Sequence, residues 1–150
     1  MSVSMSFFIR LNLSSFLYAL FPFAGIELMA NVYRLSRVTG WGLDHVNVVI
    51  LVFFFVGLLL SGFGFPKLIR HWLGGRKTSF FSLLLWIPYF MILTYIVTAW
   101  FPIIDPADKP NPVTGLIAIV VLALYPFYLA ILHLFGTTPI TEGMGEDEVT

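Results

Sequence analysis

Three uncharged stretches, each long enough to cross a membrane, constrain this chain more than any other feature. The segments "VNVVILVFFFVGLLLSGFGF" at 46–65 and "FFSLLLWIPYFMILTYIVTAWF" at 80–101 contain no Asp, Glu, Lys or Arg. The segment "VTGLIAIVVLALYPFYLAILHLF" at 113–135 adds only His133. Because about 20 apolar residues cross a hydrocarbon layer of roughly 30 Å, each segment predicts a membrane-spanning helix.

A fourth span is expected at 7–26, between Arg10 and Glu27. The alternative register, 13–32, excludes Arg10 but buries Glu27. A charge at the membrane centre costs about 2.5–3.5 kcal/mol on the insertion scale, and the long stem of arginine reaches the headgroups more easily than that of glutamate. The register 7–26 is therefore favoured. No small-x-small cleavage site follows it, so we expect a retained span rather than a signal peptide.

These segments predict an all-α polytopic membrane protein, a four-transmembrane-helix bundle. Residues 1–135 would form one membrane domain, followed by an acidic C-terminal tail at 136–150. Pro88 and Pro126 fall inside the third and fourth spans and predict kinks there. Hydrophobic residues make up 59% of the chain and charged residues 11%, against about 25% charged in soluble domains.

Composition also excludes several functions. The formal net charge of zero gives no basis for binding nucleic acid. The absence of cysteine excludes disulfides, thiolate metal sites, iron–sulfur clusters and covalent c-type haem.

The basic residues predict an orientation. The loop between the second and third spans contains four of them, and Arg10 lies near the N-terminus; the opposite side has Arg34, Arg37 and Lys109. Because Lys and Arg are retained in the cytoplasm, we expect both termini there, in a plasma or inner membrane. The loop residues are also candidates for binding anionic lipid headgroups: Lys67, Arg70, Arg76 and Lys77.

Glu27, Asn31 and Arg34 are spaced i, i+4, i+7 and share one helix face. One interpretation is an interfacial helix turn in which Glu27 pairs with Arg34. The other is a proton- or ion-binding site, because an acid within a membrane span points to function. The position of Glu27 near the span end favours the first interpretation.

Small residues predict close helix packing at Gly57, Ser61 and Gly62 in the second span. His71 and His133 would suit a b-type haem only if they faced each other, and the sequence favours ordinary interfacial or hydrogen-bonded histidines without a cofactor.

The proline-rich loop at 101–115 holds two aspartates, Asp105 and Asp108. Aspartate next to proline favours turns, and two carboxylates are too few ligands for a hard cation. We therefore expect turn formation and no metal site.

No Ser/His/Asp set, intramembrane carboxylate pair, HExxH sequence or phosphate-binding glycine loop is evident. The sequence therefore favours a non-enzymatic membrane subunit that packs with itself or with other membrane chains as an accessory or assembly component. Its partners would be membrane lipids and those chains, and not nucleic acid. The alternatives are an oligomeric small transporter or channel that uses Glu27, and a lipid- or quinone-handling protein.

Overall fold

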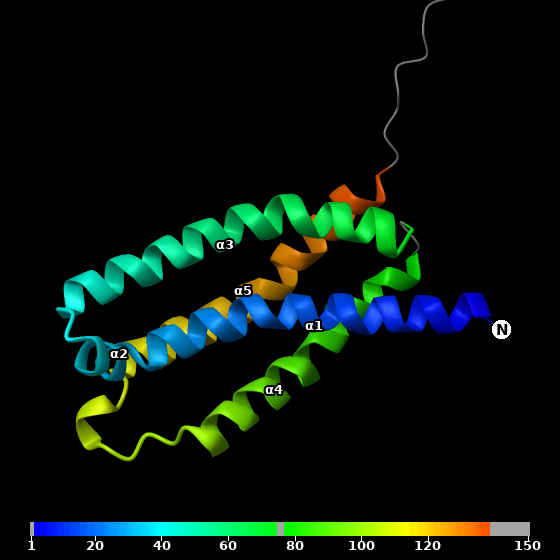
Figure 1. Ribbon diagram of the computed structural model, residues 1–150. Coiled ribbons are helices and arrows are strands. Elements are labelled where there is room, and N and C mark those ends of the chain that lie inside the picture. Colours follow the sequence, from blue (N-terminus) through cyan, green and yellow to red (C-terminus); the bar gives the residue numbers. More distant parts are fainter. Residues whose placement is uncertain (1, 75–76, 139–150) are drawn as a thin grey trace, which may run out of the picture.

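The computed structural model describes residues 2–74 and 77–138. Four long helices run alternately up and down: α1 (Ser2–Ala30), α3 (Leu43–Trp72), α4 (Ser82–Trp100) and α5 (Pro112–Thr137) (Figure 1). A short helix, α2 (Val32–Thr39), follows α1, and two 3-10 turns, η1 (Lys77–Phe81) and η2 (Pro106–Asp108), precede α4 and α5. The described residues form no strand, and all four long helices are apolar enough to cross a membrane. The expected all-α, four-span fold is confirmed.

The helices extend beyond the apolar segments that predicted them. α1 continues past Glu27 to Ala30, and α3 continues through Pro66 to Trp72. A proline removes one backbone hydrogen bond and favours a bend, and in α3, α4 and α5 the helix continues on both sides of its internal proline. Charged residues such as Lys67 remain helical because their side chains can extend from the helix end into the headgroup region.

α2 is separated from α1 by Asn31, whose backbone (φ −103°, ψ 18°) leaves the helical region. The short helix ends at Gly40, where φ is +72°. Glycine adopts this left-handed conformation without steric penalty, so it stops the helix and turns the chain toward α3.

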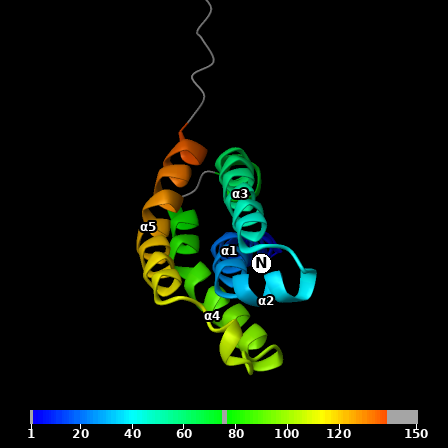
Figure 2. The same cartoon turned by 90° about the vertical axis from the view of Figure 1, so that its left-hand side faces the viewer.

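α1 lies at the centre of the bundle and contacts α3, α4 and α5. α3 and α4 lie on opposite sides of α1, and α5 packs alongside α3 (Figures 1 and 2). The long helices are apolar around most of their circumference, so amphipathicity does not select their contact faces. In lipid, small residues and interhelical hydrogen bonds make that selection.

Glycines on α1, α3 and α5 receive large side chains from neighbouring helices. The Phe54 ring of α3 fills the space beside Gly25 of α1, and the Phe21 ring of α1 fills the space beside Gly57 of α3. The rings of Phe21 and Phe54 meet edge to face, with centroids 6.2 Å apart. This reciprocal fit brings the two helix backbones close together.

Each of four helix pairs is also connected by a side-chain hydrogen bond. The bonds join α1 to α5, α1 to α4, α3 to α5 and α4 to α5. They are Tyr125 Oη to Tyr18 O (2.6 Å), Tyr89 Oη to Asn12 Oδ1 (2.8 Å), Ser61 Oγ with Tyr128 Oη (2.7 Å) and Ser82 Oγ with His133 Nε2 (3.0 Å). Such bonds contribute about 0.6 kcal/mol each on average in membrane helices, and they also fix the rotation of one helix against another.

Gly136 provides a test of the α3–α5 contact. A methyl group there would lie 2.8 Å from Ile69 Cβ and 3.2 Å from the Pro66 carbonyl, whereas a methyl group at Gly115 in the same helix would meet no atom within 4 Å. We expect Gly136→Ala to lower the free energy of unfolding by about 1–3 kcal/mol, because a backbone carbonyl and a buried Cβ cannot move aside. Denaturant-induced unfolding in detergent micelles measures the change.

Gly115→Ala is the matched control, and it should leave the free energy of unfolding unchanged or raise it by up to about 1 kcal/mol, the helix preference of alanine over glycine. Equal unfolding curves for the two variants would contradict the close approach of α3 and α5 at Gly136.

Candidate functional site

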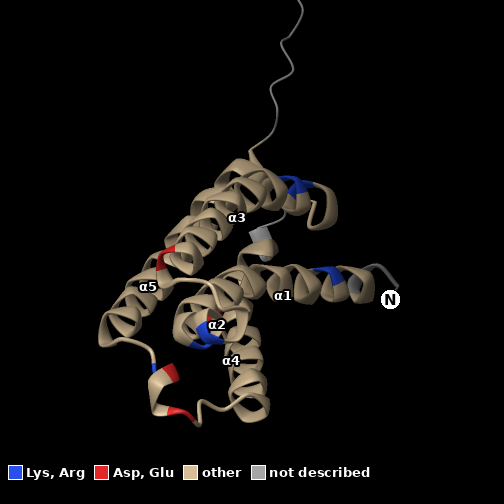
Figure 3. Ribbon diagram, turned by 60° about the vertical axis from the view of Figure 1, so that its left-hand side comes forward, with Lys and Arg blue, Asp and Glu red and all other residues tan. Residues whose placement is uncertain are grey.

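Arg34 and Arg37 of α2 hold the loop between α4 and α5 at one end of the bundle. Arg37 donates from Nε to Asp108 Oδ1 (3.1 Å) and from Nη2 to Asp108 Oδ2, which makes a two-pronged ion pair. Arg34 donates to the carbonyls of Phe101 (3.1 Å) and Pro102 (2.8 Å), and its Nε lies 3.7 Å from Asp108 Oδ2. Figure 3 shows the basic residues of α2 near the acidic turn η2. We call this set the α2 clamp.

The clamp fixes the charge state of its carboxylate. Hydrogen bonds from Arg37 lower the pKa of Asp108, with further attraction from Arg34, although burial to 3% exposure opposes the shift. The same contact raises the pKa of Arg37. Asp108 is therefore ionised throughout the physiological pH range, and the clamp is closed there.

Only part of this cluster was expected from the sequence. Asp105 accepts a hydrogen bond from the Ala107 amide (2.9 Å) and begins η2, as its turn-forming position suggested. Asp108 does more than form a turn, because it is the anion of the clamp. Its partner Arg37 lies 71 residues away, and no local sequence pattern relates the two.

Glu27 is held by Asn31 rather than by Arg34. Asn31 Nδ2 donates to Glu27 Oε2 (3.2 Å) and to the Glu27 carbonyl (2.9 Å). The hydrogen bonds of Arg34 go to Phe101 and Pro102 instead. The ion pair between Glu27 and Arg34, which one interpretation of the sequence assumed, is therefore not formed in the described part of the chain.

Glu27, Asn31 and Arg34 nevertheless line the same surface hollow, as their spacing implies. The hollow has a volume of about 430 Å³ and lies between the α1–α2 junction and the end of α4, where Val97 and Phe101 form its other wall. It offers one half-buried carboxylate and one amide. Among the described residues no three His, Asp, Glu or Cys side chains come together as metal ligands, so the chemistry available here is hydrogen bonding or the binding of a single proton or cation.

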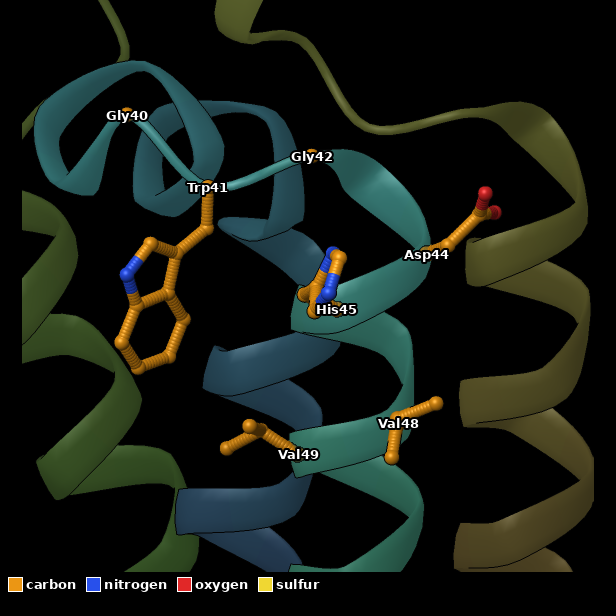
Figure 4. A pocket seen from close by; sticks show the side chains of 7 residues that line it. All are labelled: Gly40, Trp41, Gly42, Asp44, His45, Val48 and Val49. Carbon is orange, nitrogen blue, oxygen red and sulfur yellow. The ribbon is translucent and has the colours of Figure 1, made fainter.

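A second hollow, of about 670 Å³, lies at the turn between α2 and α3 (Figure 4). The Trp41 indole extends from the turn on the side of Val49, whereas Asp44 points away from it (Figure 4). Trp41 is 53% exposed, and His45 beside it is exposed as well. An exposed indole at a helix end is typical of a side chain that lies in the membrane interface.

His133 and His71 occupy different environments. His71 is exposed in the last turn of α3. His133 is fully buried, with Nε2 3.0 Å from Ser82 Oγ and Nδ1 3.0 Å from the Leu129 carbonyl. An axial haem ligand needs a ring nitrogen free to bind iron, and both nitrogens of His133 are occupied by these contacts.

The contact between Ser82 and His133 was not expected from the sequence, because the residues are 51 positions apart. A serine beside a histidine resembles the core of a nucleophilic site. Here both side chains have zero exposure, and the Ser82 hydroxyl donates to the Ser79 carbonyl (2.6 Å). The pair therefore connects α4 to α5 and presents no surface to a substrate.

The predicted packing residues contact other parts of the same chain. Gly57 faces Phe21 of α1, Ser61 bonds to Tyr128 of α5, and Gly62 faces the same tyrosine hydroxyl.

The predicted headgroup residues are described only in part. Lys67 and Arg70 are exposed near the end of α3, and Arg70 Nη2 donates to the Phe135 carbonyl (3.3 Å). Arg76, the side chain of Lys77 and the acidic tail from residue 139 onward lie outside the described residues.

No protein-family model, curated protein or solved structure matches the chain. The four apolar helices identify it as an integral membrane protein.

The α2 clamp predicts a specific dependence on pH. Because the pKa of Asp108 is lower in the folded chain than its ordinary value of about 3.9, the clamp contributes stability above that value and loses it as the pH falls through the folded-state pKa. Asp108→Asn should open the clamp at neutral pH. Amide hydrogen exchange in residues 32–39 and 101–108 should then increase.

Asp105→Asn is the control, because asparagine still accepts the hydrogen bond that starts η2. It should leave exchange in both segments close to that of the unsubstituted chain. If Asp108→Asn exchanged no faster than Asp105→Asn at neutral pH, the clamp would not be what holds α2 to the loop.

Proposed function

We propose that this protein is a non-enzymatic integral membrane subunit that assembles with copies of itself or with other membrane chains. The observation that carries the proposal is an apolar groove of about 640 Å³ between α1 and α3. Its lining is almost wholly apolar, and Ser61, the polar residue within it, is already bonded to Tyr128. We call it the α1–α3 groove.

The residues of the α1–α3 groove suit a helix as its occupant. Gly64 lines the groove, and no atom lies within 4 Å of the position that a methyl group would take there. Leu60, also in the lining, is 70% exposed. Lipid chains cover ordinary apolar surface well, but a glycine flanked by large side chains lets another helix backbone approach closely and gain packing contacts.

The arrangement of polar groups also supports a structural role. The interhelical hydrogen bonds of the described spans use side chains such as Asn12, Tyr89 and Tyr128 to join helices of this chain to one another. Catalysis would require at least two polar groups that face a site open to substrate. The pair most similar to such a site, Ser82 and His133, is buried.

The proposed orientation places the N-terminus and the residues after α5 in the cytoplasm, in a plasma or inner membrane. Arg10, Lys67 and Arg70 support it, because they lie near the start of α1 and the end of α3, which are at the same end of the bundle (Figures 1 and 3). Basic residues accumulate on the cytoplasmic side of membrane proteins.

Crosslinking in native membranes tests the proposal directly, because the chain has no cysteine of its own. Leu60→Cys places a single thiol in the groove. Phe127→Cys is the matched control, since Phe127 is 69% exposed on α5 and its neighbour Tyr128 bonds to Ser61, which puts the two thiols at a similar depth.

With a short thiol-reactive photocrosslinker, we expect Leu60→Cys to give a product of one defined mass and Phe127→Cys to give little or none. The mass distinguishes a second copy from an unlike chain. If both positions crosslink equally, or neither does, the groove is covered by lipid and the proposal fails.

A second candidate function, an oligomeric transporter or channel, is favoured by the hollow that Glu27 lines with Asn31 and Arg34. Liposomes that contain the protein and a trapped pH dye separate the two functions. A subunit should give no proton flux above that of empty liposomes. Proton flux that Glu27→Gln abolishes, while the crosslinked product from Leu60→Cys persists, would establish the transporter in its place.

A further inference from the structure

The hollow lined by Glu27, Asn31 and Arg34 carries two opposite charges that are not in contact. Glu27 and Arg34 form no ion pair among the described residues, and the hydrogen bonds of Arg34 go to carbonyls at the end of α4. Both side chains nevertheless border the same space of about 430 Å³. A ligand with a cation and an anion on neighbouring groups would satisfy both charges at once.

The Glu27 carboxylate is held in place and has room for a further partner. Asn31 Nδ2 donates to Glu27 Oε2 (3.2 Å) and is the one side chain of the described residues that bonds to this carboxylate. A carboxylate accepts about four hydrogen bonds, so Oε1 and part of Oε2 are open to a donor. Glu27 is half-buried, and Leu28 and Val97 line the hollow with it. A charge in such surroundings is stabilised by a cation that donates hydrogen bonds.

Arg34 supplies the opposite charge and fixes the shape of the hollow. Its Nη1 and Nη2 each donate one hydrogen to a carbonyl after α4, which connects the α1–α2 junction to the wall formed by Phe101. Even with Nε directed at Asp108 (3.7 Å), two of the five N–H groups of a guanidinium remain. Asp105 is an exposed carboxylate that lines the neighbouring hollow and not this one. Arg34 therefore keeps donors for an anion.

The hollow is apolar on the side that lies deeper in the membrane. Its lining residue Ala24 lies about one turn of α1 deeper than Glu27. Val97 likewise lies about one turn of α4 deeper than Phe101. Trp100, next to Phe101, is 76% exposed, and exposed indoles at helix ends are typical of the membrane interface. The charged groups therefore lie at the height of lipid headgroups, with hydrocarbon directly beneath them.

The donor groups of the ligand decide between the two common zwitterionic headgroups. A primary ammonium offers three N–H donors to Glu27, whereas a choline group has no N–H and is bound by cages of aromatic rings. Of the described residues, Phe101 is the one aromatic side chain that lines the hollow. The hollow therefore favours ethanolamine over choline.

We propose that this hollow binds the headgroup of an ethanolamine phospholipid. The ammonium group donates to the Glu27 carboxylate, the phosphate accepts from Arg34, and the acyl chains continue past Val97 into the bilayer. The hollow shares only Ala24 with the α1–α3 groove, so the lipid site does not depend on a partner helix there.

Native mass spectrometry of the full-length protein in maltoside micelles tests the proposal. The two probes are dioleoylphosphatidylethanolamine and dioleoylphosphatidylcholine, which have the same chains, phosphate and net charge and differ only in the amine. When both are supplied in equal amounts, the protein should retain about tenfold more of the ethanolamine lipid, the difference expected for one hydrogen bond between charged groups. Equal retention of the two lipids would overturn the proposal.

Glu27→Gln keeps an oxygen that accepts from Asn31 and removes the negative charge, so the preference for the ethanolamine lipid should disappear. Asp44→Asn is the matched control, because Asp44 is an exposed carboxylate in the first turn of α3 and does not line the hollow. It should retain the full preference. A preference that persists in Glu27→Gln, or that also disappears in Asp44→Asn, would contradict a site at Glu27.

Should Glu27→Gln fail to fold, Val97→Trp takes its place, because it fills the apolar side of the hollow and leaves both charges intact. It should lower retention of the ethanolamine lipid to that of the choline lipid, and unchanged retention would overturn the proposal.

Free O-phosphoethanolamine distinguishes a lipid from a soluble ligand with the same charged groups. Because it has no acyl chains, it should not displace the bound ethanolamine lipid when both are present at the same concentration. Displacement under these conditions would identify a soluble phosphorylated amine as the ligand and would overturn the assignment to a lipid.

Discussion

Lipid offers no partner for a polar side chain, and the rest of this structure depends on that constraint. Several hydrogen-bonding groups inside the four spans therefore turn toward the bundle, where they join one helix to another. Asn12 with Tyr89, Ser61 with Tyr128 and Tyr125 with the Tyr18 carbonyl each do so at a different helix pair. Three buried atoms of the described residues have no partner: Tyr18 Oη, Trp86 Nε1 and Thr94 Oγ1. The bundle thus obtains its specificity from a few directional bonds rather than from the hydrophobic effect, which does not distinguish lipid from protein.

Close packing supports these bonds. Gly25, Gly57 and Gly136 let aromatic or branched side chains of a neighbouring helix reach the backbone, so the polar groups come within hydrogen-bonding distance. This arrangement accounts for the close approach of α1 and α3, because Phe54 of α3 packs beside Gly25 of α1 and Phe21 of α1 packs beside Gly57 of α3. At Gly64, no atom of the described residues lies within 4 Å of the position of an added methyl group, and this glycine lines the groove that we propose for a partner helix.

The two ends of the bundle are fastened by different chemistry. At one end, Arg37 and Asp108 form an ion pair that stays charged throughout the physiological range, so α2 is held to the loop regardless of ordinary changes in pH. At the other end, the buried side chains of Ser82 and His133 form a hydrogen bond that joins α4 to α5.

The sequence by itself determined the fold class, since the uncharged segments at 46–65, 80–101 and 113–135 have no other stable environment than a membrane. It also placed Glu27, Asn31 and Arg34 on one face, because helical spacing is a local property. Tertiary structure alone decided what those residues bind: Glu27 pairs with Asn31, while Arg34 reaches across to Phe101 and Pro102. The partners of Asp108 and His133 likewise lie 71 and 51 residues away. In an apolar helix, the sequence pattern gives almost no indication of which face contacts which neighbouring helix. The contacts between helices are therefore defined only by the packed tertiary structure.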